Sequence, residues 1–323
     1  MIRLADCTHA EARGLARDPR AVVLLPLGAI EQHGPHLPLS VDWLGAEEIA
    51  RRIAPHLSRG GYRPVLAPAI PYGVSTLAVG WSGTVSLSLP TLRRLVVEIV
   101  GALADHGFRR VVLTNYQADP DHLRAVGRVV RDLERGRRVQ VLVAGFTPGA
   151  PPENAMANPR VRALMRSPKP EFEWHSGEVE TSVMLSMAPR LVRRDVARRL
   201  PPIRVDFAGA LRRGVKRFRQ IHPGKGYFGS PAVAKAETGR RIMTLRARLI
   251  AADLLRALDA LAASASTASS LTPRGAGGYD ALLKTAPPFP RKGGERLQGD
   301  RGGDAKKSSK RCTPQAKHGK DDC

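Results

Sequence analysis

Residues that bind metal ions or move protons are concentrated in three short segments of this sequence. The first holds Glu31, His33 and Asp42, the second spans residues 115–122, and the third spans residues 174–181. Glu31 and His33 are separated by one residue, so in an extended segment their side chains project to the same side. Carboxylate and imidazole ligands in this mixture suit Zn²⁺, Mn²⁺ or Fe²⁺. Any one segment taken alone favours polar residues that only satisfy backbone groups, but the three together favour a metal site.

The elements around these segments alternate between strand and helix. Short apolar runs predict four strands, at residues 21–26, 64–67, 110–114 and 139–144. Strands interleaved with helices predict an α/β fold with a parallel sheet covered on both faces. The three segments follow the first, third and fourth strands, and ligands in such sheets bind beyond the carboxyl ends of the strands. The pattern therefore predicts that the three segments meet at one edge of the sheet.

Apolar residues at helical spacing predict the helices between these strands. One helix is expected over residues 43–53 with Asp42 as its N-cap, and a second helix opens at Ser88. A third helix carries the apolar residues of 123–133, and a long final helix is expected to begin at Ser230.

The composition limits the classes of protein to which the chain can belong. Its 323 residues are 42% apolar, which is enough to close a core around a sheet, and the formal net charge is +23. The arginines are dispersed as pairs along predicted helices and do not interleave with aromatic residues, as nucleic-acid stacking platforms require. A solvated, arginine-rich surface is therefore favoured over nucleic-acid binding, which stays as the non-enzymatic alternative.

Hydropathy and cysteine usage bear on the cellular compartment. No run reaches the roughly 18 apolar residues of a membrane span, and residues 1–14 lack the basic head and apolar run of a secretory signal. The three cysteines, Cys7, Cys312 and Cys323, are too scattered for a disulfide framework or a cysteine zinc site. We therefore expect a cytoplasmic protein without a membrane partner.

The pattern of the chain changes after about residue 263. Apolar periodicity is continuous up to that point, whereas residues 264–323 are rich in Gly, Ser, Lys and Pro and nearly free of large aliphatic residues. Such a segment buries too little apolar surface to offset its ordering entropy. We therefore predict one domain over residues 1–263 and a basic, low-complexity, disordered tail over residues 264–323, and we interpret the tail as a non-functional extension.

Several motifs resemble, in order and spacing, those of the creatininase (creatinine amidohydrolase) family over roughly residues 4–260. The most specific is LPLGAIEQHGPHLPL at residues 25–39, and HSGEVETS at residues 175–182 is nearly as specific. Shorter matches are PYGVS at 71–75, GTVSL at 83–87 and GYFGSP at 226–231. The resemblance implies a three-layer α/β/α sandwich around a mostly parallel sheet, a binuclear metal site and hydrolysis of an amide or formamide. It also implies a homo-oligomer, often a hexamer.

The resemblance assigns roles to individual residues. Glu31, His33 and Asp42 match metal ligands, with Asp42 bridging two Zn²⁺ or Mn²⁺ ions per subunit, and Glu180 matches a carboxylate that points into the same site. His175 matches the histidine that transfers protons near the substrate. The remaining predicted site residues are Glu178 as a second catalytic group, Asp119 as a further metal ligand, and Tyr116, Gln117 and Trp174 as substrate contacts.

The second segment departs from the family pattern. Relatives have a metal-ligating histidine at the position of Gln117, and an amide oxygen is a weaker ligand than imidazole for a borderline metal. Asp119 stands where some relatives have a ligating Glu, so that contact is expected to survive. His122 could supply the missing nitrogen if the segment refolds, although a histidine there would more often lie on a helix surface.

The favoured function is a metal-dependent hydrolase of a non-peptide or cyclic amide or formamide C–N bond in a small-molecule substrate. Acidified water would attack the carbonyl, and His175 would protonate the departing nitrogen. The several acidic residues favour this function, since buried unpaired carboxylates cost several kcal/mol each. Gln117 leaves two alternatives, a metal-binding pseudoenzyme and a repurposed family member with altered chemistry. The substrate is not specified, since relatives act on a cyclic amide, on formylated pyrimidines and on short peptide termini.

Overall fold

The computed structural model of the chain describes residues 1–136, 139–147 and 158–268. Its strands are β1 (Ile2–Arg3), β2 (Ala21–Leu27), β3 (Arg63–Leu66), β4 (Arg110–Asn115) and β5 (Gln140–Gly145). Its helices are α1 (His9–Arg17), α2 (Val41–Arg59), α3 (Leu89–Asp105), α4 (Pro120–Gly136), α5 (Pro159–Arg162), α6 (Glu178–Met187), α7 (Arg194–Arg199), α8 (Phe207–Arg212), α9 (Phe218–Ile221) and α10 (Ala236–Ala268).

The strands form one parallel sheet in the order β1-β3-β2-β4-β5. Every residue of the central strand β2, AVVLLPL, is buried, because both faces of the sheet are covered. The four predicted strands are confirmed to within two residues at each end. The edge strand β1 was not predicted, since two exposed residues carry no apolar pattern.

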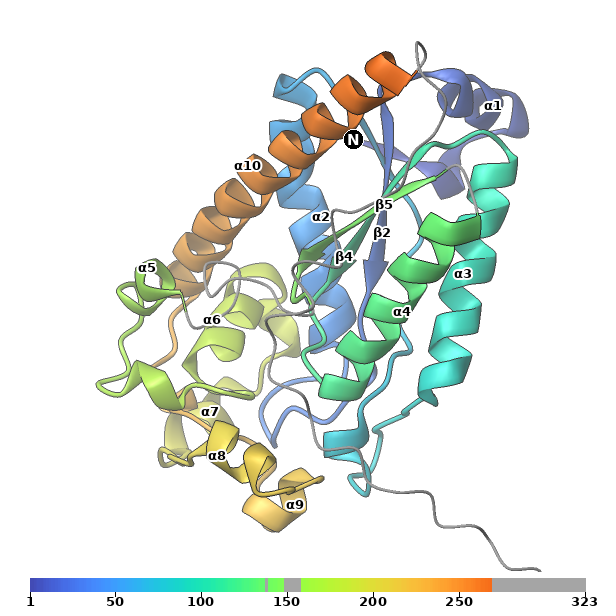
Figure 1. Cartoon of the computed structure of the whole chain (residues 1–323). Coiled ribbons are helices and arrows are strands. Elements are labelled where there is room, and N and C mark those ends of the chain that lie inside the picture. Colours follow the sequence, from blue (N-terminus) through green and yellow to red (C-terminus); the bar gives the residue numbers. More distant parts are fainter. Residues whose placement is uncertain (137–138, 148–157, 269–323) are drawn as a thin grey trace, which may run out of the picture. The chain divides into compact units, whose positions relative to one another are not determined.

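Helices cover both faces of the sheet, which confirms the three-layer α/β/α sandwich (Figure 1). On one face, α2, α6 and α10 pack against Val22 and Leu24 of the central strand. On the other face, α1, α3 and α4 pack against Val23 and Leu25. Successive strand residues therefore contribute to opposite cores, as the alternation of side chains along a strand requires.

The start of α2 differs from the prediction. The helix begins at Val41 and its N-cap is Ser40, so Asp42 is the second helical residue and not the N-cap. No backbone N–H occupies the Asp42 carboxylate as a capping bond would. Its Oδ1 lies near Nε2 of His33 in the preceding loop. Because no capping bond holds the carboxylate, Asp42 is available to the site.

The long final helix begins at Ala236, later than the predicted start at Ser230. Phe228 and Gly229 pair as isolated bridges with His175 and Ile203, which keeps this segment extended up to Ser230. A short 3-10 turn at Pro231–Val233 then leads into α10. The helix continues to Ala268, past the predicted domain boundary at residue 263, and the rest of the predicted tail, residues 269–323, lies outside the described residues.

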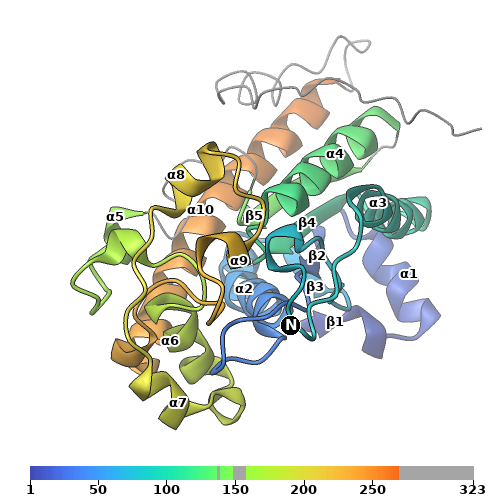
Figure 2. The same ribbon diagram turned by 90° about the horizontal axis from the view of Figure 1, so that it is seen from below.

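The segments that follow the strands gather at one end of the sheet. Seen from below, the short helices α5, α7, α8 and α9 lie with α6 on one side of α2, away from α1 and α3 (Figure 2). A third apolar cluster, which includes Phe207, Phe218 and Phe228, holds α8 and α9 together. Among the described helices, none has the length and apolar character that crossing a membrane demands.

Candidate metal centre and active site

His33, Asp42 and Glu180 bring their side chains together beyond the carboxyl end of β2. His33 lies in the loop after that strand, Asp42 in the first turn of α2, and Glu180 in the first turn of α6. Nε2 of His33 lies 3.4 Å from Oδ1 of Asp42 and 3.8 Å from Oε2 of Glu180. All three side chains are buried, and one ligand atom from each lies within 4.8 Å of the others. A single cation can span this spacing.

The loop of His33 determines which ring nitrogen faces the carboxylates. Nδ1 lies 3.0 Å from the backbone carbonyl oxygen of Glu31, which can only accept, so Nδ1 carries a hydrogen. Histidines that bind a metal through one nitrogen commonly donate the other N–H to a carbonyl in this way. Oδ2 of Asp42 is buried without a hydrogen-bond partner. The donor set and this unsatisfied oxygen fit a divalent cation.

The charges of the cluster require a positive partner. Burial lowers the pKa of His33, but the carboxylates of Asp42, Glu180 and Glu31 outweigh burial and raise that pKa to about 10. Burial, reinforced by repulsion from Asp42, raises the pKa of Glu31 to about 8. Burial also raises the pKa of Glu180. The carboxylates therefore hold a cation among them, either the second His33 proton or a metal ion that replaces it.

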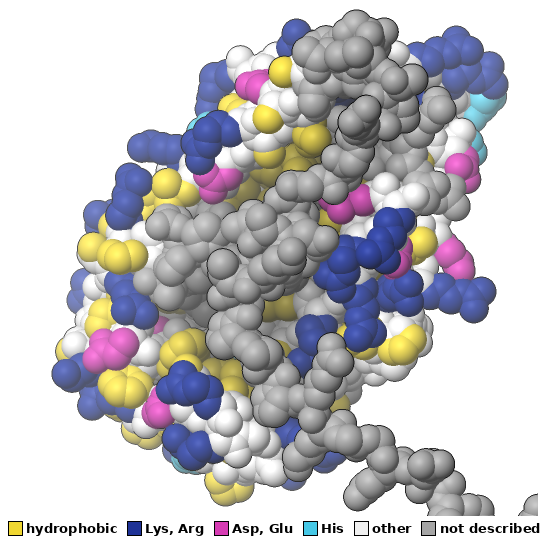
Figure 3. Space-filling view, viewed as in Figure 1, with side chains coloured by type: hydrophobic (Ala, Val, Ile, Leu, Met, Phe, Trp, Pro, Cys, Tyr) yellow, Lys and Arg dark blue, Asp and Glu magenta, His cyan; other side chains and the backbone are white. Residues whose placement is uncertain are grey.

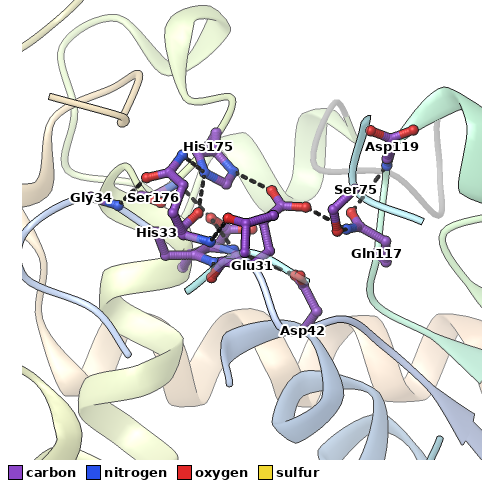
Figure 4. A network of polar contacts seen from close by, with 12 residues as sticks. Glu31, His33, Gly34, Asp42, Ser75, Gln117, Asp119, His175 and Ser176 are labelled. Carbon is purple, nitrogen blue, oxygen red and sulfur yellow. Dashed lines mark hydrogen bonds and ion pairs between the residues drawn. The ribbon is translucent and has the colours of Figure 1, made fainter. Parts of the chain in front are cut away.

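Glu31 lies between His175 on one side and the Gln117–Ser75 pair on the other (Figure 4). Its Oε2 accepts a hydrogen bond from Nε2 of Gln117 at 2.6 Å, and the same nitrogen donates to Oγ of Ser75 at 2.9 Å. Oε1 of Gln117 accepts the backbone N–H of Asp119 at 3.1 Å. Gln117 thus enters the site as a hydrogen-bond donor to Glu31, with its own oxygen engaged elsewhere.

His175 lies on the opposite side of Glu31, with Nδ1 3.8 Å from the carboxylate. Its ring packs in a tilted orientation between the rings of His33 and Phe218, with ring centroids 4.5 Å from each. Nε2 has two partners in Gln32, the backbone oxygen at 3.0 Å and the side-chain amide nitrogen at 3.1 Å. The backbone oxygen accepts and the amide nitrogen donates, so Nε2 has a hydrogen-bond partner whether or not it carries a hydrogen. Burial, aided by the charge of His33, lowers the pKa of His175 well below its usual value, so the ring is neutral.

The structure places Asp119 outside the cluster, in contrast to its predicted role as a metal ligand. Its carboxylate accepts hydrogen bonds from the hydroxyl of Thr76 and from the backbone N–H groups of Leu77 and Asp121. The described residues contain two groups of potential metal ligands, His33–Asp42–Glu180 and Glu31–His33–His175, and Asp119 belongs to neither. Asp119 therefore joins the start of α4 to the 76–77 segment.

Glu178, predicted as a second catalytic group, also points away from the cluster. Its carboxylate accepts the backbone N–H groups of Arg166 and Ser167, at distances from 2.6 to 2.9 Å. The side chain is fully buried and does not line the cavity that opens beside the His33–Asp42–Glu180 cluster. Glu178 therefore ties the start of α6 to the 166–167 loop.

His122 neither joins the cluster nor lies on a helix surface. It is fully buried in the first turn of α4, and its Nδ1 accepts the backbone N–H of Val74 at 3.2 Å. It is absent from both groups of potential ligands in the described part of the chain. Burial lowers the pKa of His122 to about 3, so the ring is neutral.

A cavity of about 290 Å³ opens beside the cluster and is lined by Glu31, Asp42, Glu180 and His175. The three predicted substrate contacts, Tyr116, Gln117 and Trp174, all line it. Trp174 is 36% exposed and stacks on Phe207, with ring centroids 5.4 Å apart. The other apolar lining residues are Leu77, Ala118, Phe146, Pro170, Ala208, Leu211 and Phe218. The cavity therefore combines a charged cluster with an apolar, largely aromatic wall.

Several residues of the site were not predicted, among them Arg246 and Ser176. Arg246 of α10 is 2% exposed, lies 5.1 Å from the ring centroid of Tyr116 and 5.0 Å from that of Phe146, and its guanidinium has no hydrogen-bond partner among the described residues. An arginine within a helix gives no sequence signal of burial. Ser176 has a φ of 54°, and its backbone N–H donates to Glu180. A left-handed residue between His175 and a glycine also carries no sequence signal, because such backbone strain comes from the tertiary structure.

Sequence comparisons show which known proteins this chain resembles. Residues 5–254 match the model of a family described as creatininase, creatinine amidohydrolase. The chain is 30% identical over 228 residues to the mycofactocin precursor peptide peptidase of Mycobacterium ulcerans (strain Agy99), covering 68% of this chain and 79% of the relative. It is 30% identical over 204 residues to the creatinine amidohydrolase of Pseudomonas putida, covering 59% of this chain and 73% of the relative.

Solved structures are similar over most of the described chain. A crystal structure of creatinine amidohydrolase (creatininase) has a TM-score of 0.59 at 26% identity, covering 78% of this chain and 96% of that one. A manganese form of creatininase has a TM-score of 0.59 at 26% identity, covering 78% of this chain and 97% of that one.

Proposed function

This chain belongs to the creatininase family of amidohydrolases, and from that membership we propose that it hydrolyses an amide C–N bond at the Glu31–His33–Asp42–Glu180 cluster with a divalent metal ion. The observation that carries the proposal is the convergence of three buried carboxylates on one imidazole, with an unsatisfied carboxylate oxygen on Asp42. Similar structures include a manganese creatininase, and carboxylate–imidazole sets accept Mn²⁺ and Zn²⁺.

His33, Asp42 and Glu180 would hold the first ion, since their ligand atoms lie together without a competing hydrogen-bond donor on Asp42. Glu31 would hold a second ion shared with Asp42. Gln117 would lower the affinity for this second ion, because its amide nitrogen donates a hydrogen bond to Glu31 and stands where relatives have an imidazole ligand. The bound metal supplies Lewis-acid chemistry, polarising the scissile carbonyl and acidifying a nucleophilic water.

His175 is the residue best placed to move the proton. The pKa of this buried ring is low, so it is neutral near pH 7 and accepts a proton before it can donate one. Its Nδ1 faces the cluster, and Gln32 supports Nε2 in either protonation state. The ring can thus take the proton of the attacking water and give it to the departing nitrogen without a change of orientation.

Two substrate classes are supported by different observations. The small cavity with its aromatic wall supports a compact amide, such as a cyclic amide or a formamide. The name of the mycobacterial relatives supports a second candidate, a peptide amide. In both classes the reaction is the same attack of water on an amide carbonyl, so the substrate panel must contain both.

The test is hydrolysis by purified protein, stripped of metal and then reloaded with Mn²⁺ or Zn²⁺. The panel holds a lactam, a formamide and short peptides, and amine release is measured for each. We expect turnover of at least one member, lost on chelation and restored by reloading. Stoichiometric metal without turnover on any member would support the pseudoenzyme alternative instead.

A further inference from the structure

The cavity beside the metal centre contains one cationic group that the proposed reaction does not use. Arg162 is the single arginine or lysine among its described lining residues. It belongs to α5, where the preceding residue Val161 is fully buried in the main core and Asn158 caps the helix through the backbone N–H of Arg160. Arg162 therefore extends from a fixed point of the structure toward the cavity that also contains Glu31 and His175.

The guanidinium of Arg162 lacks the acidic partner that several arginines of the described chain have. Its Nε is buried without a hydrogen-bond partner, and no ion pair to it occurs in the part of the chain that the structure describes. On the long helices, by contrast, Arg51, Arg52 and Arg94 each pair with a glutamate four residues away. A planar guanidinium left free at a cavity wall is suited to bidentate binding of a carboxylate.

Two acidic residues that line the cavity outside the cluster, Glu171 and Glu173, form no ion pair with Arg162. Glu173 is buried, and its Oε2 accepts the backbone N–H groups of Glu178 and Ser230, while its Oε1 is buried without a hydrogen-bond partner. Glu171 is exposed and forms no ion pair with Arg162. Arg162 is thus available to a carboxylate that comes with the substrate.

Besides the acidic residues Asp119, Glu171 and Glu173, the lining of the cavity holds three chemical parts that a substrate can contact. Glu31, Asp42, Glu180 and His175 form the hydrolytic part, and aromatic side chains including Trp174 form the apolar part. Arg162 is the third part and carries the opposite charge from the cluster. A substrate that uses all three has an amide, an apolar body and an anionic group.

We propose that Arg162 binds the carboxylate of the substrate, so that the chain acts on amides of the N-acyl amino acid type with an apolar side chain. This chemistry is shared by a free N-acyl amino acid and by the terminal residue of a peptide with an unblocked carboxyl group. The inference rests on the proposed function, because it names the substrate class of the same site.

The closing experiment compares matched pairs that differ only in the carboxylate. N-acetyl-phenylalanine is paired with its carboxamide, and a short peptide ending in phenylalanine is paired with its C-terminally amidated form. Calorimetry measures binding to metal-free and to metal-loaded protein, and amine release measures kcat/KM. The two pairs separate the free amino-acid source from the peptide source.

We expect the carboxylate form of at least one pair to bind about 10- to 100-fold more tightly than its amide, as a charged hydrogen-bonded pair implies. Arg162→Gln should abolish this preference, Arg162→Lys should keep part of it, and the effect should fall on KM more than on kcat. The matched control is Arg160→Gln, which removes the same charge from an exposed residue of α5 outside the cavity and should leave the preference unchanged.

Equal binding of carboxylate and amide by the unmodified protein would overturn the inference. A preference that survives Arg162→Gln but disappears on chelation would also overturn it, since the carboxylate would then bind the metal. Failure of the proposed function is distinguishable, because it removes amine release from every substrate while the binding comparison in metal-free protein still reports on Arg162.

Discussion

At the scale of the residue, the site is organised by charge. Glu31, Asp42 and Glu180 are buried around His33, and burial raises the pKa values of Glu31 and Glu180. These side chains have little contact with solvent, so the free energy of keeping them ionised depends on a cation in their midst. The same burial keeps His175 neutral and able to accept a proton.

His175→Asn gives the most direct test of proton transfer. The variant loses the ring that faces Glu31 but leaves His33, Asp42 and Glu180 in place, so we expect metal content to be retained. The expected loss in kcat is about 10²- to 10⁴-fold, the usual contribution of a general acid–base group. Steady-state kinetics on the best substrate, together with metal analysis of the same sample, measure both quantities. An unchanged kcat would remove His175 from the mechanism.

The sequence predicted which residues lie near one another, but not which of their carboxylates are free and which accept backbone hydrogen bonds. Glu31, His33 and Asp42 come from one short segment, and His175 and Glu180 from another, so strand order alone was enough to expect them together. Glu178 lies in the segment of His175 and Glu180, and Asp119 lies in the segment that follows β4; both are carboxylates like the residues of the cluster. Their carboxylates are taken by neighbouring backbone N–H groups, and only the folded turns show this.

At the scale of the element, close packing between α2 and the strand-end residue Tyr116 supports the wall of the cavity. Gly45 of α2 lies so near this ring that a Cβ there would come within 2.6 Å of it. The ring is held on its other sides by Phe146 and Arg246. It therefore has little room to move away.

Gly45→Ala should destabilise the protein although alanine favours helix. We expect a loss of about 1–3 kcal/mol in the free energy of unfolding, the usual cost of overpacking. The matched control is Gly14→Ala in α1, where no atom lies within 4 Å of the added Cβ. That substitution should stabilise by about 0.5–1 kcal/mol through helix propensity. Denaturant unfolding measures both, and equal effects of the two variants would contradict the packing argument.

His122 links the first turn of α4 to Val74 and makes stability depend on pH. Its folded pKa is about 3, below the unfolded value of about 6.5. The unfolded chain therefore binds more protons between these values, so stability falls as pH falls below about 6.5 and is complete above it. At pH 5 the loss from this group is about 2 kcal/mol.

Removing the titrating ring should flatten this dependence. In His122→Asn, the difference in unfolding free energy between pH 7.5 and pH 5 should shrink by about 2 kcal/mol relative to the unmodified protein. Urea unfolding at the two pH values gives the comparison within each protein, which cancels any constant loss from the substitution itself. A variant with the same pH difference as the parent would show that His122 does not titrate in this way.

Helix and strand positions followed from apolar periodicity, whereas only some of the helix starts could be predicted. Ser88 was expected to open α3, and its side chain indeed accepts the N–H of Thr91. Asp42 had the residue type of an N-cap, but Ser40 takes that position and α2 starts before Asp42. At Ser230 the pairing of the preceding residues delays the helix, and this long-range contact is not visible in local sequence.

At the scale of the whole molecule, the high positive charge calls for an explanation. Lys and Arg side chains are spread over the face seen in Figure 3, among apolar and acidic side chains, and many pair with acids on their own helix. This distribution supports a solvated surface more than a dedicated nucleic-acid groove. The layered fold itself follows from the alternation of strands and helices, which the sequence made plain.

A chain that ends after residue 268 tests the role assigned to the tail. We expect it to keep the metal content, kcat/KM and thermal unfolding of the full chain, because all described site residues precede this point. RNA and DNA binding of the full chain, measured over a range of salt concentrations, is the companion measurement. Steeply salt-dependent affinity that is lost on truncation would favour the nucleic-acid alternative instead.

Metal analysis of purified protein and two matched variants tests the central claim most directly. After loading with Mn²⁺ or Zn²⁺ and removal of excess ion, the unmodified protein should hold at least one ion per chain. Asp42→Asn should hold far less, whereas Asp119→Asn, the same substitution outside the cluster, should retain its metal. Protein that binds no stoichiometric metal under any loading condition, or an Asp42→Asn variant that binds as well as the parent, would contradict the account.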